Sequence, residues 1–206
     1  MARQAYSQEQ VDGKREEILD AAMRLFETDG IGAVSFRKLA AELGCSYVAP
    51  YRYFQNKADL VAGLRERTYR WMGEAMSAAM RPEASALNQL HDLALAYVET
   101  ALARPSRYAL LFDLSQPGTP TAEMAAAREQ AFSICTRVVS TAEANGELQL
   151  NFDPLTVAHL FWAGMHGIVA LNLAGQFVMG RSVEQLVQPL IRTLIKGVQS
   201  TPRAAT

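Results

Sequence analysis

Hydroxyl, aromatic and cationic side chains gather in one stretch of the chain, residues 35–57, with the sequence SFRKLAAELGCSYVAPYRYFQNK. Such groups donate hydrogen bonds to phosphate oxygens and contact the edges of bases. Four cations and one acid give the stretch a net charge of +3 (four minus one): Arg37, Lys38, Arg52, Lys57 and Glu42. On charge alone a solvated surface is the simpler explanation. The combination of residue types, however, predicts a surface that contacts DNA.

Two short helices joined by a tight turn would position these side chains. Ser35 is a favourable N-cap, and the helix after it has one apolar face: Phe36, Leu39, Ala40 and Leu43. Gly44 ends this helix, because without a Cβ it adopts positive φ freely. Ser46 is placed to cap a second helix over residues 46–54. The pattern predicts a helix-turn-helix motif.

The composition favours a mostly helical protein. Half of the 206 residues are hydrophobic and only eight are proline. No stretch shows sustained alternation of apolar and polar residues, so we expect an all-α fold without a sheet. The net charge of −1 gives no reason of its own to expect a nucleic-acid partner.

The apolar periodicity divides the chain into a small head, residues 1–55, and a larger body, residues 56–206. The head has a first helix over about 11–28, followed by the helix-turn-helix, and a further helix from Lys57 to Pro82 links it to the body. Five more helices are predicted in the body, over residues 84–103, 106–114, 121–145, 153–178 and 182–199.

Cysteine usage and hydropathy indicate a soluble, cytoplasmic protein. Cys45 and Cys135 lie far apart without metal-type spacing, so we expect free thiols, with Cys45 buried in the turn, and neither a metal nor a cofactor. No signal-peptide segment is evident. The longest apolar run, 155–175, is interrupted by two histidines and an asparagine.

The last two predicted helices have the composition of a dimer interface. Glycine costs about 1 kcal/mol of helix stability relative to alanine, so glycines on a helix face call for a packing reason. The predicted interface residues are small or aliphatic: Leu160, Gly164, Gly167, Leu171, Ala174, Gly175, Leu186, Leu190 and Leu194. Two copies of these helices would form a four-helix bundle about a two-fold axis, although a monomer core is the alternative.

The chain resembles the TetR family of bacterial one-component regulators. The resemblance rests on KREEILDAAMRLFETDG, VSFRKLAAELGCS and the YRYFQNKADL block. The body segment FWAGMHGIVAL resembles the Trp…His-Gly signature of a WHG-type subgroup. The resemblance implies a repressor that binds a palindromic operator as a homodimer and is released by a small ligand.

The resemblance also implies roles for individual residues in binding double-stranded DNA. Ser35, Tyr51, Tyr53 and Lys57 match positions that contact phosphates, and Arg37 matches a position that reaches a base, while Ser46 caps the second helix. The variable recognition surface corresponds to Tyr47, Val48, Ala49 and Arg52. Pro50 departs from the family pattern, where a leucine-like residue is common. Because proline is tolerated only in the first turn of a helix, we expect the recognition helix to be shifted or distorted.

A ligand site is expected in the body, lined by aromatic and apolar side chains. The candidate lining residues are Tyr97, Tyr108, Phe112, Phe132, Trp162 and His166. Aromatic residues at helical spacing are more often core than pocket, and His166 is more simply explained as a hydrogen-bonded interior histidine. The lining predicts a hydrophobic or aromatic effector.

Two other classes of function were weighed against a DNA-binding regulator. The chain lacks HExxH, GxSxG, P-loop and GxGxxG motifs, so we do not expect an enzyme. The alternative of a helical interaction module that has lost DNA binding is favoured only by Pro50.

Overall fold

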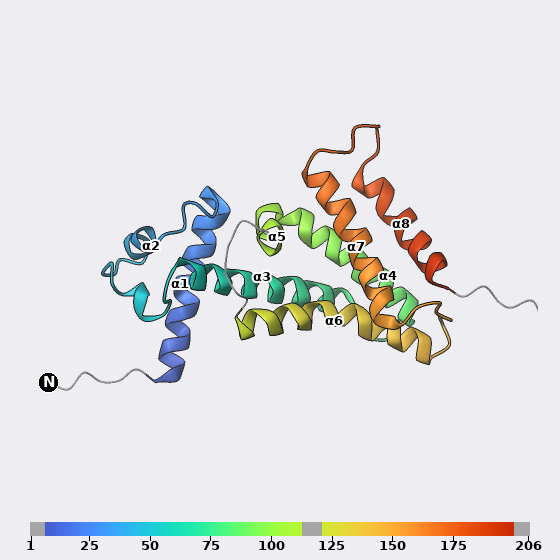
Figure 1. Cartoon of the computed structure of the whole chain (residues 1–206), viewed down its shortest axis with the longest axis horizontal. Helices are drawn as coiled ribbons and strands as arrows, with labels where there is room; N and C mark the ends of the chain where they lie inside the picture. Colours follow the sequence, from blue (N-terminus) through green and yellow to red (C-terminus); the bar gives the residue numbers. More distant parts are fainter. Residues whose placement is uncertain (1–6, 113–120, 200–206) are drawn as a thin grey trace, which may run out of the picture. The chain divides into compact units, whose positions relative to one another are not determined.

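The computed structural model describes residues 7–112 and 121–199, so the last two residues of the predicted helix 106–114 lie outside the described residues. The described residues form a series of α-helices and one 3-10 helix, η1, which confirms the all-α fold (Figure 1). Within these ranges no β-strand occurs beyond one isolated bridge between Leu150 and Gln199. In chain order the elements are α1 (Gln8–Asp29), α2 (Phe36–Glu42), η1 (Pro50–Arg52), α3 (Lys57–Ala79), α4 (Ala86–Ala103), α5 (Pro105–Leu111), α6 (Ala122–Ala144), α7 (Pro154–Leu173) and α8 (Val183–Val198).

The helices belong to two compact units. The first unit comprises Met1–Thr68 and Ala109–Ala127, and the second comprises Tyr69–Tyr108 and Arg128–Thr206. Three helices, α3, α5 and α6, therefore contribute residues to both units. The division of the chain into a DNA-binding head, residues 1–55, and a body, residues 56–206, stays a prediction.

The core of the first unit fixes the helix-turn-helix against α1. Leu39 of α2 and Phe54 lie almost fully buried in one cluster with Ile18, Leu19 and Phe26 of α1. Arg15 stacks over the Phe54 ring at 4.3 Å, and its Nη1 donates to the Tyr53 carbonyl at 2.6 Å. The segment that follows the turn is thus held at its far end by both packing and a hydrogen bond.

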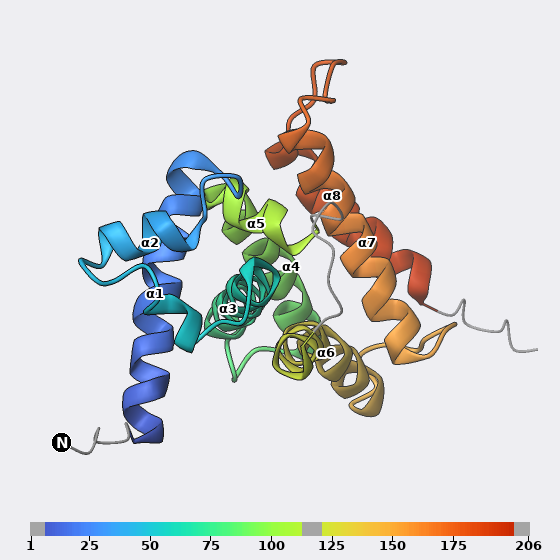
Figure 2. The ribbon, with the colours of Figure 1, turned by 60° about the vertical axis from the view of Figure 1, so that its left-hand side comes forward.

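In the second unit α7 packs between α4 and α8. The two C-terminal helices lie side by side in both views (Figure 1, Figure 2). Gly164 makes their close approach possible, because a Cβ there would lie 3.1 Å from Leu194 Cδ1 and 3.3 Å from Leu190 Cδ2. One of the predicted interface glycines therefore serves packing within the chain.

The predicted helix 153–178 is too long, because α7 ends at Leu173. Gly175 has φ of 63°, and the next amide, of Gln176, donates to the Leu171 carbonyl at 2.9 Å. This is a glycine-terminated helix end, in which the positive φ turns the chain away from the helix axis. Gly175 and Ala174 thus lie at the end of α7 and not along its face.

Candidate functional site: an exposed head surface and a pocket in the body

The segment predicted as a recognition helix over residues 46–54 is not an α-helix, and the expected distortion by Pro50 is confirmed. Its amides bond three residues back, from Ala49 to Ser46 at 2.9 Å and from Arg52 to Ala49 at 3.2 Å. Only Pro50–Arg52 has regular helical form, of the 3-10 type. Pro50 has no N–H to donate to Ser46, and in an α-helix its ring would press against that carbonyl.

The preceding helix follows the sequence prediction. Ser35 has extended backbone angles, and its Oγ accepts a hydrogen bond from the Lys38 amide at 3.3 Å, as an N-cap does. Gly44 ends the turn with φ of 62°. The expectation that Cys45 is buried was wrong, since the turn leaves this thiol exposed.

The segment after the turn exposes large side chains to solvent. Tyr47 is 54% exposed and Val48 62%. Arg37 and Arg52 are also exposed, and neither guanidinium forms a hydrogen bond or ion pair with another described residue. Apolar and cationic groups that no contact within the fold satisfies are suited to a partner surface.

The other predicted DNA-contacting residues differ in their exposure and in the contacts that they make within the fold. Lys57 Nζ donates to the Ile31 carbonyl at 3.0 Å, which leaves two of its N–H groups for other acceptors. Ser46 is exposed, whereas Ala49 and Tyr53 are half-buried, the latter packed on the cluster around Phe54. The described surface thus brings most of the predicted set together around α2 and η1.

Tyr47 and Tyr51 form an exposed pair. Their hydroxyl oxygens lie 3.0 Å apart, and the Tyr51 ring lies 4.2 Å from that of Phe36 between centroids. The hydrogen bond with Tyr47 raises the pKa of Tyr51, to which burial and the charge of Tyr47 add. The Tyr51 hydroxyl is therefore protonated at neutral pH.

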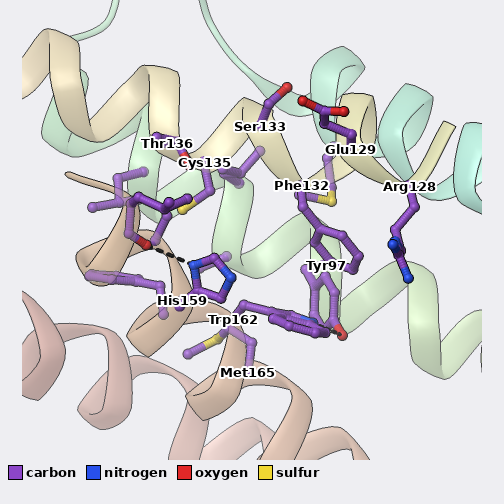
Figure 3. A pocket seen from close by; sticks show the side chains of 17 residues that line it. Tyr97, Arg128, Glu129, Phe132, Ser133, Cys135, Thr136, His159, Trp162 and Met165 are labelled. Carbon is purple, nitrogen blue, oxygen red and sulfur yellow. Dashed lines mark hydrogen bonds between the residues drawn. The ribbon is translucent and has the colours of Figure 1, made fainter. Parts of the chain in front are cut away.

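A partly open pocket of about 540 Å³ lies in the second unit (Figure 3). Its walls come from α4, α6 and α7, with Met76 from the end of α3. Three of the six predicted ligand residues line it, namely Tyr97, Phe132 and Trp162, and the Phe132 and Trp162 rings lie 4.5 Å apart between centroids. Tyr108, His166 and Phe112 do not line it.

Tyr108 and His166 join the pocket wall through a chain of hydrogen bonds. Trp162 Nε1 donates to the Tyr97 hydroxyl at 3.3 Å, which lies 2.8 Å from the Tyr108 hydroxyl. That oxygen in turn lies 2.6 Å from His166 Nδ1. Burial raises the pKa of Tyr97 to about 12 and also raises that of Tyr108, while it lowers the pKa of His166. His166 is therefore neutral at pH 7 and hydrogen-bonded, as an interior histidine is.

The polar residues of α6 that line the pocket were not among the predicted ligand residues. Arg128, Phe132 and Thr136 follow one another at four-residue spacing, so they lie on one helix face, and Glu129, Ser133 and Cys135 complete it. This spacing was the available signal, but polar residues on a helix face are usually exposed to solvent. Burial raises the pKa of the Cys135 thiol to about 12, which keeps it neutral.

On α7, the pocket adds His159, which was not among the predicted ligand residues. Its Nδ1 lies 2.8 Å from the Leu155 carbonyl and therefore donates to it. Among the residues that the structure describes, no three His, Cys, Asp or Glu side chains come together in a group that could hold a metal ion.

Another face of α7 is apolar and exposed. Leu160 is 40% and Leu171 46% exposed, and a Cβ added at Gly167 would meet no atom within 4 Å. Leu186, Leu190 and Leu194 of α8 are half-buried. In the described part of the chain, α7 is the helix long and apolar enough to cross a membrane, but this is weak evidence because helices of soluble proteins pass the same test.

Comparison with known proteins identifies the class. Residues 90–194 match the family model of the tetracyclin repressor-like C-terminal domain, and residues 18–64 match that of bacterial regulatory proteins of the tetR family. The chain belongs to the TetR family of helix-turn-helix transcriptional regulators. Its membership of the WHG-type subgroup stays a prediction.

Individual relatives are similar at moderate identity. Nucleoid occlusion factor SlmA of Haemophilus influenzae is 26% identical over 113 residues, 52% of each chain, so our chain spans about half the length of the first curated relatives it matches. An HTH-type transcriptional regulator of Mycobacterium tuberculosis is 24% identical over 205 residues, which cover 83% of our chain and 84% of the regulator.

Solved structures share the fold along nearly the whole chain. A protein of unknown function from Rhodococcus sp. RHA1 is 28% identical, with a TM-score of 0.80, and the match covers 96% of our chain and 100% of that chain. A bacterial regulatory protein of the tetR family from Rhodococcus RHA1 is 20% identical, with a TM-score of 0.67, and the match covers 91% of our chain and 97% of that chain. The latter likeness concerns the fold alone.

Proposed function

We propose that the protein is a cytoplasmic, homodimeric repressor without catalytic activity that binds a palindromic operator and leaves it when a small, apolar ligand occupies the body. The observation that carries the proposal is the presence of two dissimilar sites in one chain. The first unit exposes two unpaired arginines and a pair of tyrosines around α2 and η1, and the second unit contains a largely apolar pocket of about 540 Å³. That volume lies within the range of small-molecule sites, about 300–1,000 Å³.

In the proposed complex the head side chains divide into two groups. Tyr51, Tyr53, Lys57 and Ser35 contact phosphates, since each offers an O–H or N–H donor. Arg37 forms the paired hydrogen bonds that its planar guanidinium makes with guanine O6 and N7, and Val48, with its exposed methyl groups, suits contact with the thymine methyl. Tyr47, Ala49 and Arg52 complete the sequence-selective surface.

A second copy of the chain is needed because one head offers few cations. The exposed apolar face of α7 around Leu160, Gly167 and Leu171 supports a homodimer, since association would remove that surface from water. A dimer would have to place its two recognition segments about 34–36 Å apart to meet successive major grooves. A ligand that binds better to a different spacing would release the DNA by shifting the population. Because α3 contributes residues to both units, we assign the coupling to this helix.

The most informative experiment is retrieval of genomic DNA fragments by the full chain, followed by gel shifts on the recovered site. We expect a palindrome, with affinity that falls steeply as salt rises. Arg37→Ala should lose about 1–3 kcal/mol of preference at one base pair, whereas Lys57→Ala should weaken binding similarly on all sequences. If both variants altered only sequence preference, these roles would be wrong. If no palindrome were bound, the proposed function would be wrong, and an interaction module or an enzyme would be the alternative.

The dimer has its own test. Leu171→Glu should yield monomers in sedimentation equilibrium and abolish operator binding, because a carboxylate would be buried unpaired in the interface. Phe152→Ser is the matched control, since Phe152 is similarly exposed, at 49%, but precedes α7. A dimer that persists in the Leu171 variant would place the interface elsewhere.

A further inference from the structure

Among the described residues that line the pocket, Arg128 is the only lysine or arginine. Its guanidinium forms no hydrogen bond or ion pair with any described residue. In Figure 3 its side chain extends from α6 along one side of the pocket, to about the level of the Phe132 ring. The cation therefore stands beside the aromatic part of the cavity with its donors uncommitted.

Three other polar side chains of the lining, Glu129, Ser133 and His159, do not compete with Arg128 for an anion. The Glu129 carboxylate points away from the pocket, beyond Phe132 (Figure 3). Ser133 Oγ donates to the Gln130 carbonyl at 3.0 Å and accepts from Arg137 Nη1 at 2.6 Å. His159, on the opposite side from Arg128, donates through Nδ1 to the Leu155 carbonyl, so that nitrogen is not available to a ligand.

The interior of the pocket is unsuited to a buried charge. Away from the polar residues of α6 and His159, its walls are mostly aliphatic, thioether and aromatic groups, and the Cys135 thiol is neutral because burial raises its pKa to about 12. The Tyr97 hydroxyl is already bonded to Tyr108 and to Trp162. An ionised ligand group is stable only where a counter-charge with free donors meets it, and a guanidinium binds a carboxylate through two parallel hydrogen bonds.

From these observations we infer that the ligand is an apolar monocarboxylic acid. Its carboxylate pairs with Arg128 at the side of the pocket, and its hydrocarbon part lies over Phe132 and Trp162. This inference rests on the proposed function, because it takes the pocket as the effector site. It adds the chemical class of the effector and the residue that selects it.

The test uses decanoate and phenylbutyrate as probes, each compared with the primary amine and the primary alcohol of the same carbon skeleton. Dissociation constants are measured by calorimetry on the full chain. Each acid should bind at least about tenfold more tightly than its alcohol, and Arg128→Gln should remove that advantage while leaving alcohol binding unchanged. Arg192→Gln is the control for lost charge, since Arg192 is exposed on α8 and does not line the pocket. It should retain the preference for acids.

Three results would overturn the inference: amine or alcohol binding as tight as acid binding, an acid preference that survives in Arg128→Gln, or no binding of either acid. Operator binding by the ligand-free protein, measured on the same preparation, tests the proposed function separately. A protein that binds its operator but shows any of these three results would still be a DNA-binding regulator, with an effector of another class.

Discussion

Two pairs of tyrosines in this chain have nearly the same geometry in opposite surroundings. In the head, Tyr47 and Tyr51 lie with hydroxyls 3.0 Å apart and rings inclined by 67°. In the body, Tyr97 and Tyr108 lie with hydroxyls 2.8 Å apart and rings inclined by 86°. The head pair is 54% and 42% exposed, whereas the body pair is 4% and 2% exposed.

The difference shows that surroundings, and not pair geometry, decide what a hydroxyl can do. The hydrogen bond with Tyr47 is the main reason that the pKa of Tyr51 is raised, while burial is the main reason for Tyr97 and Tyr108. In water an unmade hydrogen bond is replaced by one to solvent, so the head pair is free to exchange partners. In the interior the same loss leaves an unsatisfied polar group.

The largest expected effect breaks the buried pair. Tyr108→Phe removes the hydroxyl between Tyr97 and His166 Nδ1, so the free energy of unfolding should fall by about 1–3 kcal/mol. Urea unfolding followed by circular dichroism, at one fixed protein concentration, measures this. Tyr47→Phe is the matched control in the exposed pair and should change the value by less than about 0.5 kcal/mol. Equal effects of the two variants would mean that burial does not distinguish the pairs.

A smaller effect is expected on DNA binding, where the exposed pair and not the buried pair should matter. Tyr51→Phe removes a donor from the head surface and should weaken operator binding by about 1 kcal/mol, roughly fivefold, whatever the base sequence. Gel shifts on the operator and on scrambled DNA measure this. Tyr97→Phe, studied where it is fully folded, should leave ligand-free operator affinity unchanged. A loss limited to the operator would assign Tyr51 to base contact.

The smallest expected effect is on the pH dependence of stability, through His166, the hydrogen-bond partner of the buried tyrosine pair. Burial lowers the pKa of His166, so the unfolded chain binds its proton more readily than the folded one. This contribution to stability is thus fully present above the unfolded pKa, about 6.5, and is lost as the pH falls below that value and through the lower pKa of the folded protein. His166→Asn should flatten the decline in stability between neutral and mildly acid pH. An unchanged slope would show that other groups cause the decline.

Local signals in the sequence predicted much of the fold. The Ser35 cap and the Gly44 turn are decided by neighbouring backbone groups, so both were recognised correctly. Most predicted helix bounds hold within a few residues for the same reason. The error at the end of α7 arose because Ala174 and Gly175 continue the small-residue pattern of the helix, although the positive φ of Gly175 ends it.

The pocket was harder to predict because its parts meet only through the tertiary fold. Tyr108 and His166 are 58 residues apart, and no periodicity indicates that one bonds to the other. Arg128 and Thr136 have the polarity of a solvated helix face, so their four-residue spacing alone does not distinguish a pocket lining from an exposed surface. The residues that the sequence did place there are aromatics, whose size makes burial in one cluster or another nearly obligatory.

The 3-10 form of η1 has a consequence for protein engineering. Each residue of a 3-10 helix advances by about 2.0 Å and turns by a third of a revolution, whereas an α-helix advances by about 1.5 Å with 3.6 residues per turn. Tyr51 and Arg52 therefore point in directions that an α-helical segment would not give them. Side chains chosen for an α-helical recognition segment, grafted onto these positions, would not transfer that segment's preference for its operator sequence. The donor segment would have to replace residues 46–54 as a whole, Pro50 included.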